Sequence, residues 1–394
     1  MADGTIDAER VGGAAKLSTD KITTTTRDPN ELGWRIGAWM TAWLPQGTTA
    51  EVYDVAKPEG NGMSSETLLY SARWIEDGTP VQRRFVARIE PELDKVPIFP
   101  SYDLRLQFDV MALVGAATEA PVPEVLWFEA DGAVIGAPFF VMARSDGEVP
   151  PDVMPYTFPD SCWLSHASTA DQMRLQCSAV EALVGIHQVT PEVHDLDFLV
   201  PDQPGATSLE RHLGGWEDYL EWATADDRSP LLDECFAWLR ANLPEEGGDT
   251  GAPRLSWGDA RIGNMMFVDF EVAAVLDWEM ASVAPPEVDL GWMVYLHRFF
   301  QDITTDLGAD GMAVFMRPVD VVSTYEAASG RRVGDLRWHI AYAAMRHGVI
   351  MRRVTERGVL FGEAERPADA DDMIIHRATL SCMLDGTYWQ TLAL

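Results

Sequence analysis

The chain has 394 residues, which is enough for two domains or for one large two-lobed unit. Its hydrophobic fraction of 47% and charged fraction of 23% are typical of a globular protein. No apolar run approaches the roughly 18 residues that a membrane span needs. The formal net charge of −32 disfavours nucleic acid and anionic membranes as partners. It would attract cationic small molecules, unless the surplus acid only maintains solubility.

Neither a secretion signal nor a cysteine framework is evident in the sequence. The N-terminus, MADGTIDAER, lacks a basic segment followed by an apolar one, so we expect a cytoplasmic protein. The four cysteines lie far apart and form no CxxC pair, which disfavours disulfides and a structural metal site. The oligomeric state is not indicated.

The first third of the chain is rich in short β-like runs. Residues 1–30 are polar and predict a flexible lead-in, and residues 31–142 predict an N-terminal nucleotide-binding lobe. Apolar runs on either side of turn signals predict two hairpins with a helix between them. The predicted strands cover 68–74, 84–89, 123–128 and 138–142, and the helix covers 104–114.

The remainder of the chain is mostly helical in pattern. Residues 143–150 are predicted to form a hinge, and residues 151–394 a C-terminal catalytic and substrate-binding lobe. Helices are expected over 171–187 and 210–243, with short strands near Leu255 and over 265–276. The first of these helices is predicted to be amphipathic from apolar residues at helical spacing, namely Met173, Cys177, Val180 and Val184. A β-rich part followed by a helical part predicts an α+β fold with two lobes.

The most informative polar residues lie in LSWGDARIGNMMF over 255–267 and VLDWE over 275–279. Asp259 and Asn264 follow an apolar run on a glycine-containing loop, and Asp277 ends a second apolar run. If the two strand ends converge, two carboxylates and an amide meet. These are the hard oxygen ligands and proton acceptors that phosphoryl transfer with Mg²⁺ requires. Gly-Asp and Asn are also common in turns, so the loop alone does not decide the function.

Together with PPEVDLGW over 285–292, these segments resemble the aminoglycoside phosphotransferase and choline kinase-like family, which is itself similar to protein kinases. That family carries an HGDxxxxN catalytic loop, a DxE-type metal motif and a downstream Asp-Leu pair that opens a helix. The match extends from about residue 51 to about residue 296, and it looks especially like kinase-like domains associated with acyl-CoA dehydrogenases. The resemblance implies a protein-kinase-like fold that uses ATP and Mg²⁺.

Residue by residue, the resemblance implies distinct roles around the catalytic loop. Asp259 would orient the acceptor hydroxyl and take its proton, while Asn264 and Asp277 would hold Mg²⁺. Arg261 would neutralise the γ-phosphate, or else is an exposed loop arginine. Asp289 would bond the backbone of the catalytic loop.

The resemblance also implies a phosphate-covering loop in the N-terminal lobe. The segment GNGMSSE matches it, with Gly60, Gly62, Ser64 and Ser65 as the small residues that allow backbone N–H groups to approach phosphate. A bare GxG is also compatible with a plain turn.

Three further positions are assigned to the nucleotide site, and two of them depart from the family pattern. Arg88 stands where the family has a phosphate-binding Lys, and Gln107 stands where it has the acidic partner of that Lys. We expect an Arg88–Gln107 hydrogen bond, and adenine bound to backbone groups near Met142. The family's His before Gly-Asp is Trp257 here. His187 is expected to be a core or loop residue.

The function predicted from these residues is ATP- and Mg²⁺-dependent phosphate transfer to a hydroxyl of a small molecule. An aminoglycoside-like cation is the leading acceptor, because acidic residues gather where the family places substrate-contacting helices. These residues, which could equally form a solvated surface, are Glu217, Asp218, Glu221, Asp226, Asp227, Asp233 and Glu234. The alternatives are a kinase of an amino alcohol or a hydroxyacyl thioester, or a non-catalytic nucleotide-binding pseudokinase.

Overall fold

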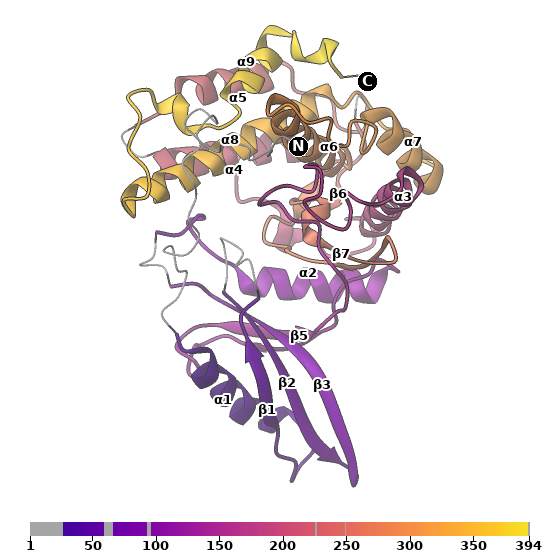
Figure 1. The fold of residues 1–394 in the computed structure, drawn as a ribbon, viewed down its shortest axis with the longest axis vertical. Coiled ribbons are helices and arrows are strands. Elements are labelled where there is room, and N and C mark those ends of the chain that lie inside the picture. Colours follow the sequence, from indigo (N-terminus) through magenta and orange to yellow (C-terminus); the bar gives the residue numbers. More distant parts are fainter. Residues whose placement is uncertain (1–26, 59–65, 93–95, 225–226, 249, 393–394) are drawn as a thin grey trace, which may run out of the picture.

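Five antiparallel strands form the sheet of the N-terminal lobe in the spatial order β1-β2-β3-β5-β4 (Figure 1). The computed structural model describes residues 27–58, 66–92, 96–224, 227–248 and 250–392. The strands are β1 (Glu51–Ala56), β2 (Glu66–Glu76), β3 (Thr79–Ile89), β4 (Val125–Glu129) and β5 (Phe139–Ala143). Between β2 and β3, Asp77 and Gly78 both have positive φ, as a two-residue turn of the type I′ class requires. Both predicted hairpin pairs are present.

Two helices pack on the sheet. The first, α1 (Pro29–Met40), starts inside the predicted lead-in and buries Leu32 and Ile36 in a cluster with β2, β3 and β5. The second, α2 (Leu104–Ala117), buries Val110 and Val114 in a separate cluster that includes core residues of the C-terminal lobe. Figure 1 shows α2 between the sheet and the helical lobe. The sheet is therefore held between α1 and a helix that joins it to the rest of the molecule.

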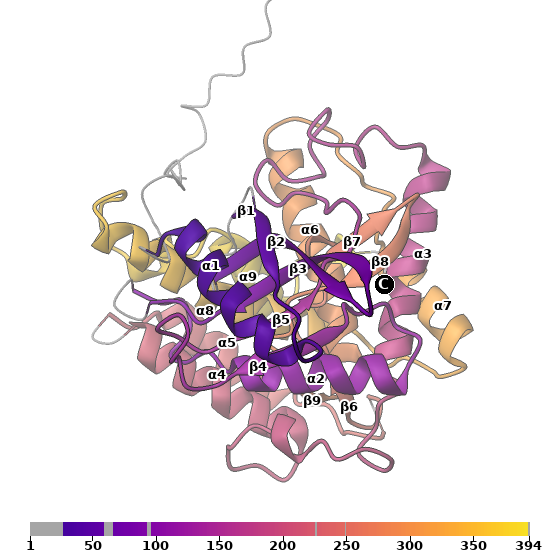
Figure 2. The same ribbon diagram turned by 90° about the horizontal axis from the view of Figure 1, so that it is seen from below.

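Helices dominate the C-terminal lobe (Figure 2). They are α3 (Thr169–Ile186), α4 (Ser208–Thr224), α5 (Pro230–Ala241), α6 (Glu287–Asp306), α7 (Pro318–Ser329), α8 (Arg337–Leu360) and α9 (Arg377–Asp385). Two short antiparallel pairs lie among them, formed by β6 (Arg254–Ser256) with β9 (Ser282–Ala284) and by β7 (Met265–Val268) with β8 (Glu271–Val275). In the part of the chain that the structure describes, no helix has the length and apolarity of a membrane span.

The predicted amphipathic helix is present as α3. Of the four apolar residues that predicted it, Val180 is buried and Met173, Cys177 and Val184 are partly buried, while the buried positions include Leu175, Ala179, Leu183 and Ile186. The helix carries apolar residues on two adjacent faces, so the sequence period alone does not select one of them. Packing of α3 against its neighbours selects the face.

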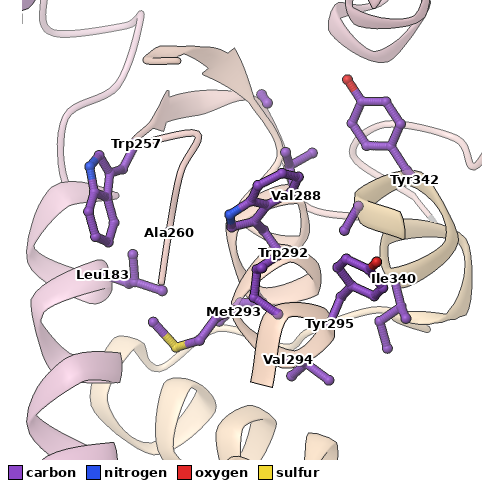
Figure 3. Packing of buried hydrophobic residues seen from close by; sticks show 14 of the residues in the cluster. Leu183, Trp257, Ala260, Val288, Trp292, Met293, Val294, Tyr295, Ile340 and Tyr342 are labelled. Atoms are coloured by element: carbon purple, nitrogen blue, oxygen red, sulfur yellow. The ribbon is translucent and has the colours of Figure 1, made fainter. Parts of the chain in front are cut away.

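The central helices α6 and α8 cross at a close contact. A Cβ atom on Gly291 of α6 would lie 2.7 Å from the backbone carbon of His339 on α8. Figure 3 shows the neighbouring Trp292, Val294 and Tyr295 of α6 against Ile340 and Tyr342 of α8. Glycine at this position lets α6, which carries Asp289 and Trp292, approach α8 closely.

Gly291→Ala is expected to destabilise the protein by about 1–3 kcal/mol, because the added methyl group overpacks the α6–α8 contact. Gly115→Ala in α2 is the matched control, since a Cβ atom there meets nothing within 4 Å. That change should stabilise the protein by up to about 1 kcal/mol through helix propensity. Urea denaturation of both variants measures the difference. Equal effects at the two glycines would contradict the tight crossing.

Candidate active site

The buried carboxylate of Asp289 organises the loop that follows β6. Asp289 is 0% exposed, lies in the first turn of α6 and accepts hydrogen bonds from the Trp257 N–H (2.8 Å) and the Gly258 N–H (2.9 Å). The Ser256 hydroxyl (2.8 Å) and the His187 imidazole (3.0 Å) are its other partners. The prediction that Asp289 bonds the loop backbone is confirmed, and His187 lies in the core as expected.

Two contacts join this loop to the segment after β8. Gly258 has a φ of +89°, and a Cβ atom there would collide with the Met280 carbonyl, so only glycine fits. The Trp257 indole N–H donates to the carbonyls of Leu276 (2.9 Å) and Asp277 (3.0 Å). Trp257, the departure from the family's His, therefore holds the ends of the two strands together.

Asp259 is half-buried, and both of its carboxylate oxygens accept hydrogen bonds. The Asn264 amide donates to Oδ2 (2.7 Å), and the Trp292 indole donates to Oδ1 (2.7 Å). Trp292 is buried, and Figure 3 shows it between Ala260 of the loop and α8. The sequence prediction missed Trp292, whose one available signal is its position three residues after Asp289 on the same helix. The structure thus gives Asp259 a fixed orientation.

Arg261 is ion-paired on both sides. Its guanidinium donates to Asp259 (3.1 Å from Nε to Oδ1) and also to Asp152. Burial by itself lowers the pKa of Arg261, but the two carboxylates outweigh it and raise that pKa above its ordinary value. Arg261 is therefore not a free loop arginine in this structure. Asp152 was missed because it lies in the Pro- and Asp-rich segment that follows the predicted hinge.

Asn264 and Asp277 are adjacent through the backbone. The Asn264 carbonyl accepts a hydrogen bond from the Leu276 N–H (2.8 Å), which places Asp277 beside the catalytic loop. The Asn264 amide nitrogen donates to Asp259, so the amide oxygen is not used in these bonds. Asp277 has a φ of 57°, and such strained non-glycine residues concentrate at functional sites.

The donor set fits Mg²⁺ better than a metal held by protein alone. Among the described residues there is no group of three or more His, Cys, Asp or Glu side chains that could hold a metal. Mg²⁺ is commonly held by one or two side-chain oxygens together with phosphate oxygens and water. Asn264 and Asp277 match that requirement.

Arg88 lies next to the predicted metal ligands. Its guanidinium donates to Asp277 Oδ1 (3.3 Å) and to the Thr67 hydroxyl (3.4 Å). The expected Arg88–Gln107 hydrogen bond is wrong, since the hydrogen bonds of the Arg88 guanidinium go to Asp277 and Thr67 and none goes to Gln107. A charged carboxylate attracts the guanidinium more strongly than a neutral amide does. The structure therefore joins Arg88 to Asp277, a residue 189 positions away.

Two further nucleotide contacts were predicted, one in the phosphate-covering loop and one near Met142. Gly60, Gly62, Ser64 and Ser65 lie outside the described residues. At the end of β5, Met142 is buried and pairs with Val86 of β3 and Val125 of β4. The N–H groups of the two residues that follow Met142 already donate to carbonyls, those of Glu124 (2.8 Å) and Arg84 (3.0 Å). Any adenine contact there must use other backbone groups.

Most of the acidic residues assigned to a cationic acceptor have basic or polar partners. Glu217 pairs with Arg240, Asp233 pairs with Arg228 (2.8 Å), and the Gln203 amide donates to Asp218 (2.6 Å). Asp227 pairs with Arg352 (2.9 Å) and Arg366 (3.2 Å), whereas Asp226 lies outside the described residues. This surface therefore offers little unpaired negative charge to a cation.

Asp289→Asn should lower the free energy of unfolding by about 3 kcal/mol, because it removes a buried anion from four donors. Burial alone would raise the pKa of Asp289, but His187, Gly258 and Ser256 outweigh it and hold that pKa below its ordinary value. The stabilisation is thus present above about pH 4 and is lost as the pH falls through the lowered pKa. Urea denaturation at pH 7 and at acidic pH should show the wild-type advantage shrinking.

The control for this change is Asp306→Asn at the exposed end of the same helix, which should alter stability by less than about 0.5 kcal/mol. An Asp289→Asn protein as stable as the wild type at pH 7 would contradict the anchoring role.

Solved structures share this architecture. A protein from Ralstonia eutropha JMP134 named as an aminoglycoside phosphotransferase superposes with a TM-score of 0.63, is 21% identical and covers 92% of this chain and 99% of its own. Aminoglycoside 2′-phosphotransferase-IIIa, in a GDP complex, superposes with a TM-score of 0.51 at 15% identity over 92% of this chain and 100% of its own. These similarities confirm the predicted two-lobed, kinase-like α+β fold.

The sequence comparisons identify the family. The Arabidopsis thaliana protein named acyl-CoA dehydrogenase IBR3 is 24% identical over 76% of this chain, and human acyl-CoA dehydrogenase family member 11 is 29% identical over 43%. The chain covers only 36% and 20% of the lengths of these two relatives. The model of the phosphotransferase enzyme family matches residues 70–315, which is more than half of the chain. The chain therefore belongs to the phosphotransferase enzyme family.

Proposed function

We propose that the chain transfers the γ-phosphate of ATP, with Mg²⁺, to a hydroxyl of a small molecule. The observation that carries this proposal is the convergence of Asp259, Asn264 and Asp277 on two joined strand ends. In the reaction a bond forms between the acceptor oxygen and the γ-phosphorus, and the bond from that phosphorus to the β-bridging oxygen breaks. The hydroxyl proton passes to Asp259 Oδ2 or Oδ1, and the products are a phosphomonoester and ADP.

Each residue of the site would have a distinct role in the reaction. Asn264 and Asp277 would hold the metal, whose role when bound is to neutralise charge on the phosphate oxygens. Arg88, whose Nη2 lies 3.3 Å from Asp277 Oδ1, would contact the same phosphates. Trp292 would keep the Asp259 carboxylate turned toward the acceptor. Arg261 would place a positive charge beside the reacting group, held there by Asp152.

Two alternatives are separated by particular observations. A pseudokinase would need no oriented carboxylate, whereas Asp259 is held by Asn264 and Trp292. Among acceptors, the paired acidic surface gives no support to an aminoglycoside-like cation. Relatives named as acyl-CoA dehydrogenases favour a hydroxyacyl thioester over an amino alcohol.

Asp259→Asn should lower kcat by about 100-fold or more, because the amide cannot take the hydroxyl proton but has nearly the same size. The Kd for Mg-ATP should stay within about twofold, since Asp259 is not assigned to the metal or the nucleotide. Single-turnover phosphate transfer and titration calorimetry measure the two quantities. Near-wild-type turnover would remove Asp259 from the chemistry.

Arg88→Ala should raise the KM for ATP by about tenfold or more, because it removes a charge-assisted contact to phosphate. Arg83→Ala is the control, since Arg83 is an exposed arginine of the same strand that lies over the Trp74 ring. Gln107→Ala should cost less than Arg88→Ala, because Gln107 makes no hydrogen bond to Arg88 in the structure. Unchanged ATP kinetics in Arg88→Ala would show that the N-terminal lobe binds nucleotide differently.

A further inference from the structure

Arg346 of α8 is a buried cation without an acidic partner. Its side chain is 1% exposed, and no carboxylate of the described residues lies within ion-pair distance of it. Two of its nitrogens, Nε and Nη2, have no hydrogen-bond partner in the part of the chain that the structure describes. Buried guanidinium groups normally have such partners, because unmet donors in a protein interior are costly.

Three aromatic rings surround this guanidinium. Its central carbon lies 4.2 Å from the ring centre of Trp292, 4.8 Å from that of Tyr342 and 5.7 Å from that of Trp216. Cation–π contacts stabilise the charge but cover the faces of the planar group, so its N–H donors remain at the edge. Trp292 and Tyr342 are buried, whereas Trp216 on α4 is half-buried, so Trp216 is the most exposed of the three rings.

Trp292 lies between Arg346 and the proposed base. The indole of Trp292 contacts Arg346 through its ring and Asp259 Oδ1 through its N–H. The other oxygen of Asp259 faces Asn264, on the metal side. Trp292 therefore links Arg346 directly to the proposed base.

Another buried arginine of the same helix, Arg352, differs from Arg346 in having carboxylate partners. Arg352 is also buried, but its guanidinium is bonded to Glu356 (3.0 Å) and Asp227 (2.9 Å). Burial lowers the pKa of Arg346 below its ordinary value, and Tyr342, Asp289 and Asp259 only partly oppose this effect. In a chain with a net charge of −32, carboxylates are abundant, yet no carboxylate of the described residues lies within ion-pair distance of Arg346.

We propose that Arg346 binds an anionic oxygen group of the acceptor, a carboxylate or a phosphate, so that the site selects hydroxylated anions. This inference rests on the proposed phosphotransfer and specifies its acceptor class. The N–H groups at the edge of the guanidinium would donate hydrogen bonds to the anion, in the way that arginine commonly binds planar oxyanions. The aromatic rings would hold the intervening carbon chain.

The experiment compares acceptors that differ only in charge. The probes are ω-hydroxycarboxylates of three to six carbons, the diols and amino alcohols of the same lengths, and the corresponding hydroxyalkyl phosphates. Binding is measured by calorimetry in the presence of Mg-ADP, and turnover by ADP release from ATP. The wild type should bind at least one anionic series about tenfold or more tightly than its neutral counterpart. The carboxylate and phosphate arms identify which anion is preferred.

Variants then assign the preference to Arg346. Arg346→Met keeps an apolar stem and should abolish the preference for anions, whereas Arg346→Lys keeps the charge and should retain part of it. Arg352→Lys is the matched control and should leave the preference intact. Melting temperatures report whether each variant folds. If Arg346→Met does not fold, the comparison of anionic and neutral acceptors with the wild-type protein still tests the inference.

The outcomes separate this inference from the proposed function. ATP turnover with diols or amino alcohols bound as tightly as the anions would overturn the anion site and leave phosphotransfer standing. Absence of binding by every anion would also overturn it, as would an unchanged preference in Arg346→Met. Anion binding that depends on Arg346, without any transfer of phosphate, would support the site and overturn the proposed function.

Discussion

The buried carboxylate of Asp289 is the contact on which the rest of the site depends. It is an anion in the core that is stable only because loop N–H groups, a hydroxyl and the His187 imidazole surround it. The same bonds that satisfy the charge fix the backbone of Trp257 and Gly258, and the loop then carries Asp259 in one orientation. The hydrogen bonds that stabilise this buried charge therefore also fix the position of the proposed base.

Around Asp259 the molecule is divided into two chemically different halves. On one side lie amide and carboxylate oxygens together with Arg88, a set suited to a metal and phosphates. On the other side lie Trp292 and Arg346, a set suited to an organic acceptor with an anionic group. Asn264 bonds one oxygen of the Asp259 carboxylate and Trp292 bonds the other, while Arg261 contacts both.

The departures from the family pattern are compensated by contacts within the structure. Trp257 replaces a histidine, but its indole N–H spans the gap to the carbonyls of Leu276 and Asp277. Arg88 replaces a lysine and finds a carboxylate at Asp277. Much of the acid on the surface is paired with arginine, whereas the buried Arg346 has no carboxylate of the described residues within ion-pair distance. Net charge therefore says little about the sign of the charge that an acceptor meets.

The sequence by itself determined the features that depend on local pattern. Alternation and turn residues predicted the hairpin of β2 and β3, and motif spacing predicted the meeting of Asp259, Asn264 and Asp277 on two strand ends. Only the tertiary structure decided which face of α3 is buried, that Arg88 contacts Asp277 rather than Gln107, and that Arg346 lies near the base. These features involve residues far apart in the chain. Helical period and motif spacing record neighbours along the sequence, whereas packing alone brings distant side chains together.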